Sequence, residues 1–228
     1  MADIKTLLRS SLGLTRALIR QCWWILMVIF SLGFAMQLSL EDTATSTLPT
    51  DETARIMANL TLAVGDLLFG ILIFFALSFA YWRLRPQKSP RFLQKPFDRP
   101  YLGSFFAEYL RVLGQILLWA LLVLIPGFIR YVHLIFVPLI VLFSSDYEDG
   151  KIDALKQSQL MVKNWFWFLL IFLALTGAAQ LGLELLPLAA EALHEIPARI
   201  SLGLVGVLIS VWSYSVIVLI FEQEMQKQ

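Results

Sequence analysis

The sequence predicts an all-α, polytopic transmembrane helical bundle with about six spans. Of its 228 residues, 58% are hydrophobic and only 15% are charged, whereas about a quarter of the residues in a soluble domain are charged. The mean hydropathy is +0.73, and the apolar residues gather in runs close to the roughly 20 residues that a helix needs to cross a bilayer. Most side chains must therefore face lipid or one another.

The apolar runs give the expected order of spans within a single integral membrane domain, 1–228. We expect spans at about 18–40, 56–82, 110–126, 128–143, 165–186 and 200–221. The two middle runs are shorter than the others and are separated by Ile125-Pro126-Gly127. They form either a tight hairpin of two spans or one kinked, partly re-entrant element.

Basic residues predict the orientation of the spans. If the N-terminus is cytoplasmic, the cytoplasmic segments hold 14 of the 18 Lys and Arg residues, and an excess of basic residues is typical of cytoplasmic loops. The first outer connection, 41–52, is instead acidic and rich in hydroxyl groups. An even number of spans with both termini in the cytoplasm fits every long loop.

Two segments have the pattern of basic amphipathic helices that lie at the membrane interface before the first and fifth spans. In 4–20, the apolar residues fall on one side of a helical wheel and Lys5, Arg9, Arg16 and Arg20 fall on the other. The segment 151–164 carries Lys156 and Lys163 in a similar setting. Since a basic residue near anionic lipid contributes about 1 kcal/mol to membrane binding, all six are candidate contacts for lipid headgroups.

These two segments also resemble each other. Residues 17–24 align with residues 160–167 at a constant offset of 143, each with a basic residue and an amide residue before interfacial aromatic residues. Each is followed by two spans. Spans 1–2 and 5–6 are either parallel copies around a central hairpin or two instances of one common membrane-entry pattern.

Asp66 is the most notable ionisable residue within a span, because a charge near the bilayer centre costs about 2.5–3.5 kcal/mol on insertion scales. It lies ten residues into the segment 56–82. Gly70 follows one turn later and is expected to permit close approach of another helix. Asp66 is either a proton- or ligand-linked carboxylate or a hydrogen-bonded structural residue.

Further polar residues follow helical spacing on the last two spans. Thr176, Gln180 and Glu184 form a polar stripe, and the sixth span carries a small-residue face of Gly203, Gly206, Ser210 and Ser213. These are either helix contacts or parts of a polar path. Arg130 is expected to pair with Glu184, the alternative being an arginine that extends to the interface.

Several stretches resemble one group of bacterial membrane proteins. They are Ile-Pro-Gly-Phe-Ile-Arg-Tyr at 125–131, Phe-Val-Pro-Leu-Ile at 136–140, the acidic 146–149, and Ala-Leu-Lys-x-Ser with Val-Lys-Asn-x-x-Trp within 154–167. The group is that of the six-helix inner-membrane proteins of unknown function related to the membrane domain that precedes some glycerophosphodiester phosphodiesterases. The resemblance implies a bacterial inner-membrane location. It implies no enzyme, because the chain has no segment that supplies the His- and acid-bearing phosphodiesterase site.

Motif inspection predicts no catalytic function. The chain lacks a phosphate-binding lysine loop, a Gly-x-Ser-x-Gly elbow and a His-Glu-x-x-His zinc motif, and its single cysteine, Cys22, belongs to no metal-ligand cluster. We expect no cofactor, no metal and no nucleic acid, and as partners membrane lipids with either another membrane protein or a second copy. The expected function is that of a scaffold, accessory or envelope-homeostasis component. The alternative is a small transporter or lipid-handling protein with a polar path around Asp66.

Overall fold

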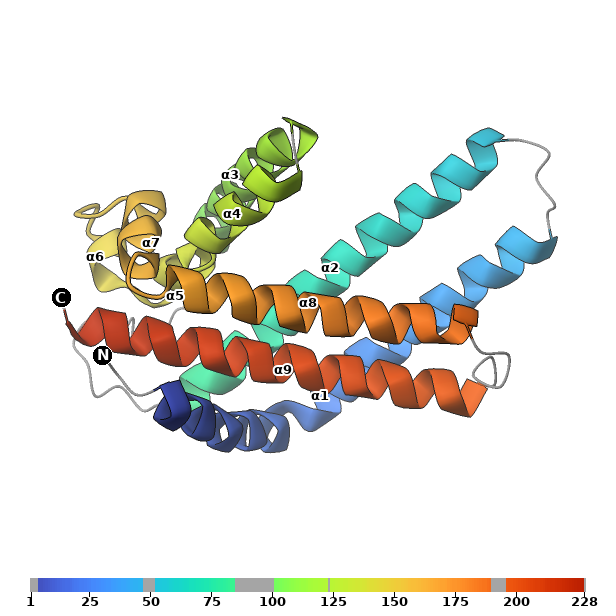
Figure 1. Cartoon of the computed structure of the whole chain (residues 1–228), viewed down its shortest axis with the longest axis horizontal. Helices are drawn as coiled ribbons and strands as arrows, with labels where there is room; N and C mark the ends of the chain where they lie inside the picture. The colour runs from blue at the N-terminus through green and yellow to red at the C-terminus, as the bar shows by residue number, and fades with distance from the viewer. Residues whose placement is uncertain (1–3, 47–51, 85–100, 123, 190–195, 228) are drawn as a thin grey trace. The chain divides into compact units, whose positions relative to one another are not determined.

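The computed structural model describes residues 4–46, 52–84, 101–122, 124–189 and 196–227. Their regular secondary structure is entirely helical, as predicted. The helices are α1 (Ile4–Ser46), α2 (Glu52–Leu84), α3 (Tyr101–Leu122), α4 (Leu124–Leu134), α5 (Val137–Phe143), α6 (Ser145–Glu148), α7 (Ala154–Val162), α8 (Phe166–Ala189) and α9 (Ile196–Gln226). Figure 1 shows their order along the chain.

Four helical segments among the described residues are long and apolar enough to cross a membrane. They are Ile4–Leu32, Ile125–Phe143, Phe166–Leu183 and Ile200–Gln226. α2 has 33 residues, which is about 50 Å of helix at 1.5 Å per residue, and a shorter apolar stretch within it covers Gly70–Leu84. The chain is therefore an all-helical protein whose long apolar helices suit a membrane. Six spans remain a prediction, because the side chains of 33–46 and of most of 52–69 are not described.

α1 joins the amphipathic segment and the first predicted span in one helix that bends at Cys22 (Figure 1). The backbone of Cys22 is non-helical, with φ −126° and ψ 15°. On the apolar side of the helical wheel Leu7 and Leu18 are buried whereas Ile4 is exposed, and on the other side the basic residues are all exposed: Lys5, Arg9, Arg16 and Arg20.

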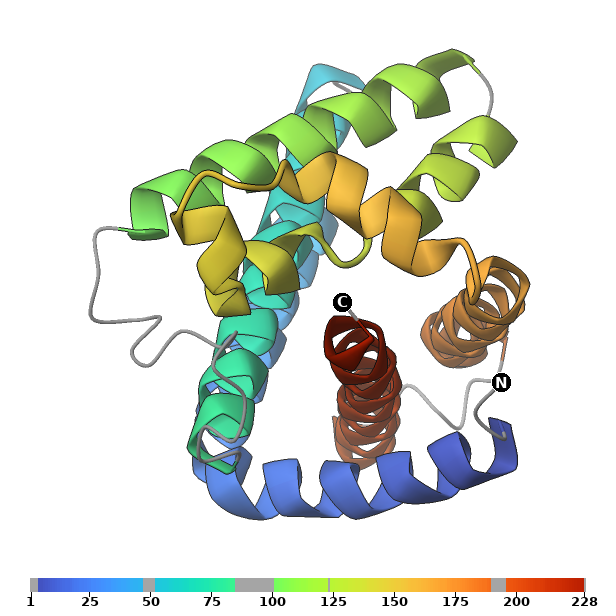
Figure 2. The same cartoon turned by 90° about the vertical axis from the view of Figure 1, so that its left-hand side faces the viewer.

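The break between the two middle helices lies a few residues before Pro126-Gly127 rather than at them. α3 ends at Leu122 and α4 begins at Leu124, so Pro126 is the third residue of α4. A proline is tolerated there because the N–H groups of the first helical turn have no partner within the helix. α3 and α4 lie side by side as an antiparallel pair (Figures 1 and 2).

A second break, which the sequence did not predict, divides the segment 128–143. α4 ends at Leu134, two residues form a turn, and α5 begins at Val137. Every residue of α5 except Pro138 is buried. Because a surface helix buries only one face, burial all round marks α5 as a core element, surrounded in part by α3 and α7.

The contacts divide the chain into two compact units. Unit 1 comprises Met1–Ser11, Arg85–Ala179 and Ser215–Gln228, and unit 2 comprises Leu12–Leu84 and Gln180–Tyr214. α1, α8 and α9 therefore contribute residues to both units. The core of unit 1 is built around α5, where the ring of Phe136 contacts that of Phe221 on α9, with centroids 6.1 Å apart.

Candidate functional site

α7 and the start of α8 form an elbow in unit 1. Asp153 caps α7, with its Oδ1 accepting a hydrogen bond from the Leu155 N–H at 2.9 Å, as expected for an aspartate at a helix N-terminus. After α7 ends, Lys163, Asn164 and Trp165 form turns before α8 begins. Figure 2 shows α7 along its length and α8 nearly end-on, so α7 runs across the direction of α8.

The inner side of α7 is tied to the break between α4 and α5. The hydroxyl of Ser158 donates to the His133 carbonyl at 2.8 Å and accepts from the Phe136 N–H at 3.2 Å. Ser158 is fully buried, and a buried backbone group without a hydrogen bond is costly. This serine, part of the Ala-Leu-Lys-x-Ser stretch, thus compensates for the interrupted helix.

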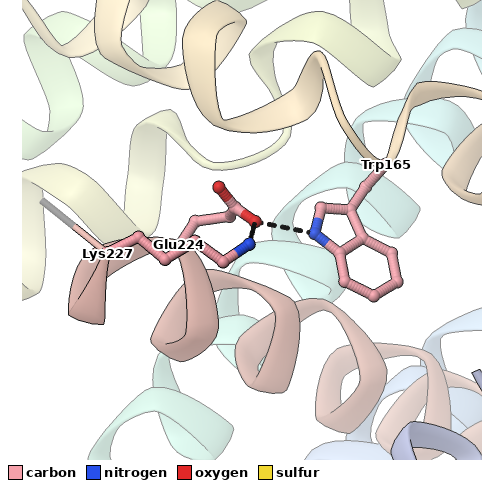
Figure 3. Close-up of polar contacts among 3 residues, drawn as sticks. All are labelled: Trp165, Glu224 and Lys227. Carbon is pink, nitrogen blue, oxygen red and sulfur yellow. Dashed lines mark hydrogen bonds and ion pairs between the residues drawn. The ribbon is translucent and has the colours of Figure 1, made fainter. Parts of the chain in front are cut away.

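A second contact ties the elbow to the end of α9 (Figure 3). The Trp165 indole N–H donates to Glu224 Oε1 at 2.9 Å, and Lys227 forms an ion pair with the same oxygen. Glu224 is only 6% exposed, and a buried carboxylate requires such donors. The three residues therefore join the start of α8 to the end of α9.

The outer side of the elbow carries both basic and apolar side chains. Lys156, Leu160 and Lys163 are exposed at spacings of four and seven residues, which place them on one helical face. Leu160 is 64% exposed and Trp167, on the first turn of α8, is 72% exposed. We call these four residues the elbow face.

The bend of α1 has the same local pattern as the elbow. At the offset of 143, Cys22 corresponds to Trp165, so the bend and the elbow fall at equivalent positions. Burial agrees at six pairs: buried residues match at Leu18/Met161, Leu26/Leu169 and Ile29/Phe172, and exposed residues match at Arg20/Lys163, Trp24/Trp167 and Leu32/Leu175. It differs at Leu12/Leu155 and Ala17/Leu160. The agreement supports two copies of one helix–bend–helix pattern.

The predicted polar stripe contributes to helix packing. In unit 2, the side-chain amide of Gln180 donates to Ser210 Oγ at 2.9 Å, joining α8 to the small-residue face of α9. In unit 1, Thr176 donates to the carbonyl of Phe172 in its own helix at 3.0 Å. The side chain of Glu184 lies outside the described residues.

Unit 2 contains a buried polar contact that sequence reasoning missed. Ser78 on α2 and Tyr214 on α9 are buried, and their hydroxyl oxygens are 2.8 Å apart. The Tyr214 ring also meets Phe74 edge-on, with centroids 5.7 Å apart. The sequence signal was weak, because α2 and α9 each carry several hydroxyl residues and their spacing does not show which of them meet.

The small-residue face of α9 is not uniform. A Cβ added at Gly203 would lie 2.6 Å from the ring of Phe30 on α1, whereas one at Gly206 would meet no described atom within 4 Å. Gly70 is exposed, and an added Cβ there would likewise meet nothing within 4 Å in the described part of the chain. The close helix approach expected at Gly70 is thus not seen among the described residues, whereas Gly203 does lie close to another helix.

This difference gives opposite expectations for two glycine substitutions. Gly203→Ala is expected to lower the thermal unfolding temperature in detergent, because the methyl group overlaps the Phe30 ring. Gly206→Ala, the matched control, is expected to raise it, because alanine favours a helix by up to about 1 kcal/mol over glycine. Phe30→Leu should restore Gly203→Ala toward the parent. Equal shifts for the two alanine variants would contradict the assigned contact.

Arg130 and His133 lie on α4. Arg130 is half-buried, and its Nε has no hydrogen-bond partner among the described residues. His133 Nδ1 lies 2.8 Å from the Ile129 carbonyl, and its ring packs on Phe166 with centroids 4.9 Å apart. The pairing of Arg130 with Glu184 stays a prediction. The side chain of Asp66 also lies outside the described residues.

Tyr147 links α6 to α3 outside the candidate spans. Burial raises the pKa of Tyr147, and the charge of Glu108 and a hydrogen bond to it raise it further. Glu108 also lies 3.6 Å from the Arg111 guanidinium. The phenol therefore stays protonated and can serve as a hydrogen-bond donor to Glu108.

The long apolar helices are of the kind expected in a membrane protein, and the elbow adds a surface with exposed basic and apolar side chains. Comparisons with protein-family models, curated proteins and solved structures give no match to this chain. In the described part of the chain, no group of three or more His, Cys, Asp or Glu residues could hold a metal ion. The contacts described above hold helices against one another. The elbow face is different, because its basic and apolar side chains are exposed.

Proposed function

We propose that this chain is a non-catalytic integral protein of the bacterial inner membrane, serving as a scaffold, an accessory subunit or an envelope-homeostasis component. The hydrogen bond between Gln180 and Ser210 is the observation that carries the proposal. A polar path needs such groups to face water or a substrate. Here the amide donor is occupied by a neighbouring helix.

Three other described polar residues of the long helices support the same interpretation. Thr176 donates to its own helix, and Ser78 and Tyr214 bond to each other. Hydrogen bonds between membrane helices contribute about 0.6 kcal/mol on average. These residues are therefore sufficiently explained by assembly of a helical bundle.

The proposal includes six spans with both termini in the cytoplasm and interfacial helices before the first and fifth spans. The distribution of basic residues supports the orientation. The bend at Cys22 and the elbow before α8 support interfacial helices, since each separates an amphipathic segment from a long apolar helix. The resemblance to the six-helix inner-membrane proteins supports the bacterial location.

Thiol labelling in sealed membrane vesicles tests the proposal. The chain has one cysteine, so Cys22→Ala gives a cysteine-free parent for single substitutions at Thr176, Gln180, Ser210 and Asp66. We expect a small water-soluble thiol reagent to leave cysteines at 176, 180 and 210 at least tenfold less reactive than one at exposed Lys156, because Thr176 is buried and Gln180 and Ser210 lie partly buried at the contact between α8 and α9.

Cysteines at two further positions test which side of the membrane the connecting segments face. Ser89→Cys should react only from the cytoplasmic side and Ser46→Cys only from the outer side if the proposed orientation holds. Rapid labelling at 66, 180 and 210 in the folded protein would overturn the scaffold proposal. That result would favour the transporter or lipid-handling alternative, in which these residues line one polar path.

A further inference from the structure

We infer that the elbow face binds the headgroups of anionic lipids, and that the bend of α1 repeats part of this site. The inference deepens the proposed function, since it assigns a ligand class to a surface of the membrane protein. It rests on the spacing, exposure and fixed orientation of Lys156, Leu160, Lys163 and Trp167.

The elbow face has a defined orientation because the opposite side of α7 is fixed. Ser158 bonds to two backbone groups at the break between α4 and α5, and Met161 and Val162 are buried. Trp165 is held by Glu224 at the end of α9. α7 therefore cannot rotate about its axis without losing these contacts, so its two lysines stay on the outer side.

The charges of the elbow face are available to a ligand. Lys156 and Lys163 are exposed, and among the described residues neither forms an ion pair. They are seven residues apart, or about 10 Å along a helix. Ammonium groups bind phosphate as point charges, so each lysine can meet the phosphate of a separate lipid.

The apolar members of the face place the site at the edge of the hydrocarbon region. A candidate span begins at Phe166, so Trp167 lies at its entrance and Lys163 lies one turn earlier. Tryptophan is enriched at this depth in membrane proteins. Leu160 lies between the two lysines in sequence and is exposed, as in helices that lie in the interface with basic residues above the acyl chains. A bilayer surface therefore suits this face better than a purely polar anion.

The bend of α1 repeats one feature of the elbow face, a basic residue followed four residues later by a tryptophan. Arg20 and Trp24 are four residues apart, as are Lys163 and Trp167, and all four are exposed. Arg16 adds a further exposed charge one turn earlier. Gly13 and Ala17 stand where the elbow face has Lys156 and Leu160, so the bend of α1 offers the same ligand class a smaller set of contacts.

Titration with a short-chain lipid tests the inference. An environment-sensitive dye is attached at Asn164→Cys in the Cys22→Ala parent, and the full chain in neutral detergent is titrated with dihexanoyl phosphatidylglycerol. We expect a saturable response that weakens with salt. Lys156→Gln and Lys163→Gln should each raise the half-saturation concentration about fivefold, from roughly 1 kcal/mol per basic residue. Lys151→Gln, at an exposed lysine outside the face, should leave it unchanged.

Each control outcome decides for or against the site. Dihexanoyl phosphatidylcholine and inorganic phosphate should give no saturable response at matched concentration. An equal response to either ligand would overturn an anionic-lipid site, as would unchanged titration in both lysine variants with parent-like unfolding temperatures. Loss of lipid binding alone would leave the labelling results at 180 and 210 intact, so failure of this inference is distinguishable from failure of the proposed function.

Discussion

Replacing Ser158 with alanine is expected to destabilise the protein by about 2–4 kcal/mol, because the change leaves one buried and one partly buried backbone group without this hydrogen-bond partner. These are the Phe136 N–H and the His133 carbonyl, which the single hydroxyl satisfies. The loss is measured as the change in free energy of unfolding by denaturant titration in mild detergent.

Ser144 provides a matched control. It is also buried, but its hydroxyl has no hydrogen-bond partner in the described part of the chain. Ser144→Ala should therefore change the free energy of unfolding by less than about 0.5 kcal/mol, and Ser158→Thr should retain more stability than Ser158→Ala. Similar losses for the two alanine variants would remove the role assigned to the Ser158 hydroxyl.

Replacing Trp165 with phenylalanine is expected to cost about 1–3 kcal/mol, because it removes one of two donors to a buried carboxylate. The remaining donor to Glu224 is Lys227, whose side chain is 58% exposed. Since solvent screens an exposed charge, Lys227→Gln should cost less than about 1 kcal/mol. The free energy of unfolding should thus depend more on the indole than on the lysine.

A double-mutant cycle isolates this contact. Trp165→Phe should cost less in a Glu224→Leu background, where no carboxylate needs the indole donor. Trp167→Phe is the control, because that tryptophan also lies at the start of α8 but is largely exposed; it should change stability by no more than about 0.5 kcal/mol. Equal costs of Trp165→Phe in both backgrounds would exclude an energetic coupling to Glu224.

Helical periodicity predicted the faces of individual helices well. In α1, the wheel separated exposed Arg9 and Arg16 from buried Leu7 and Leu18. This succeeds because the 3.6-residue period is a local property of the helix, and solvent preference acts on each side chain in turn. The same logic identified α7 before any contact was known.

Helix breaks were harder to predict, because their position depends on distant partners. Pro126 and Gly127 suggested a break, yet α4 accommodates both in its first turn. The residues at the second break, 135 and 136, include neither proline nor glycine. Pro138, in the first turn of α5, was the local signal, since a proline cannot donate the N–H that would continue α4. The other support comes from Ser158, which is 22 residues from Phe136 in the chain and which no local pattern indicates.

The use of polar residues within spans also depended on neighbouring helices. The spacing of Thr176 and Gln180 placed them on one stripe, but Thr176 bonds to its own helix and Gln180 bonds to Ser210. Likewise, small size did not distinguish Gly203, which faces Phe30, from Gly206, which has open space. The partner across the contact decides the role of each.

The sequence by itself determined that this is an all-helical protein with long apolar helices, because hydropathy and helical period are summed residue by residue along the chain. It also identified the basic side of α1 and the likeness of 17–24 to 160–167. Only the tertiary structure decided where α4 and α5 divide and which polar groups meet: Ser158 with the broken helix, and Trp165 with Glu224. Hydrogen bonds require particular donors and acceptors within about 3 Å, and packing brings such groups together from distant parts of the chain.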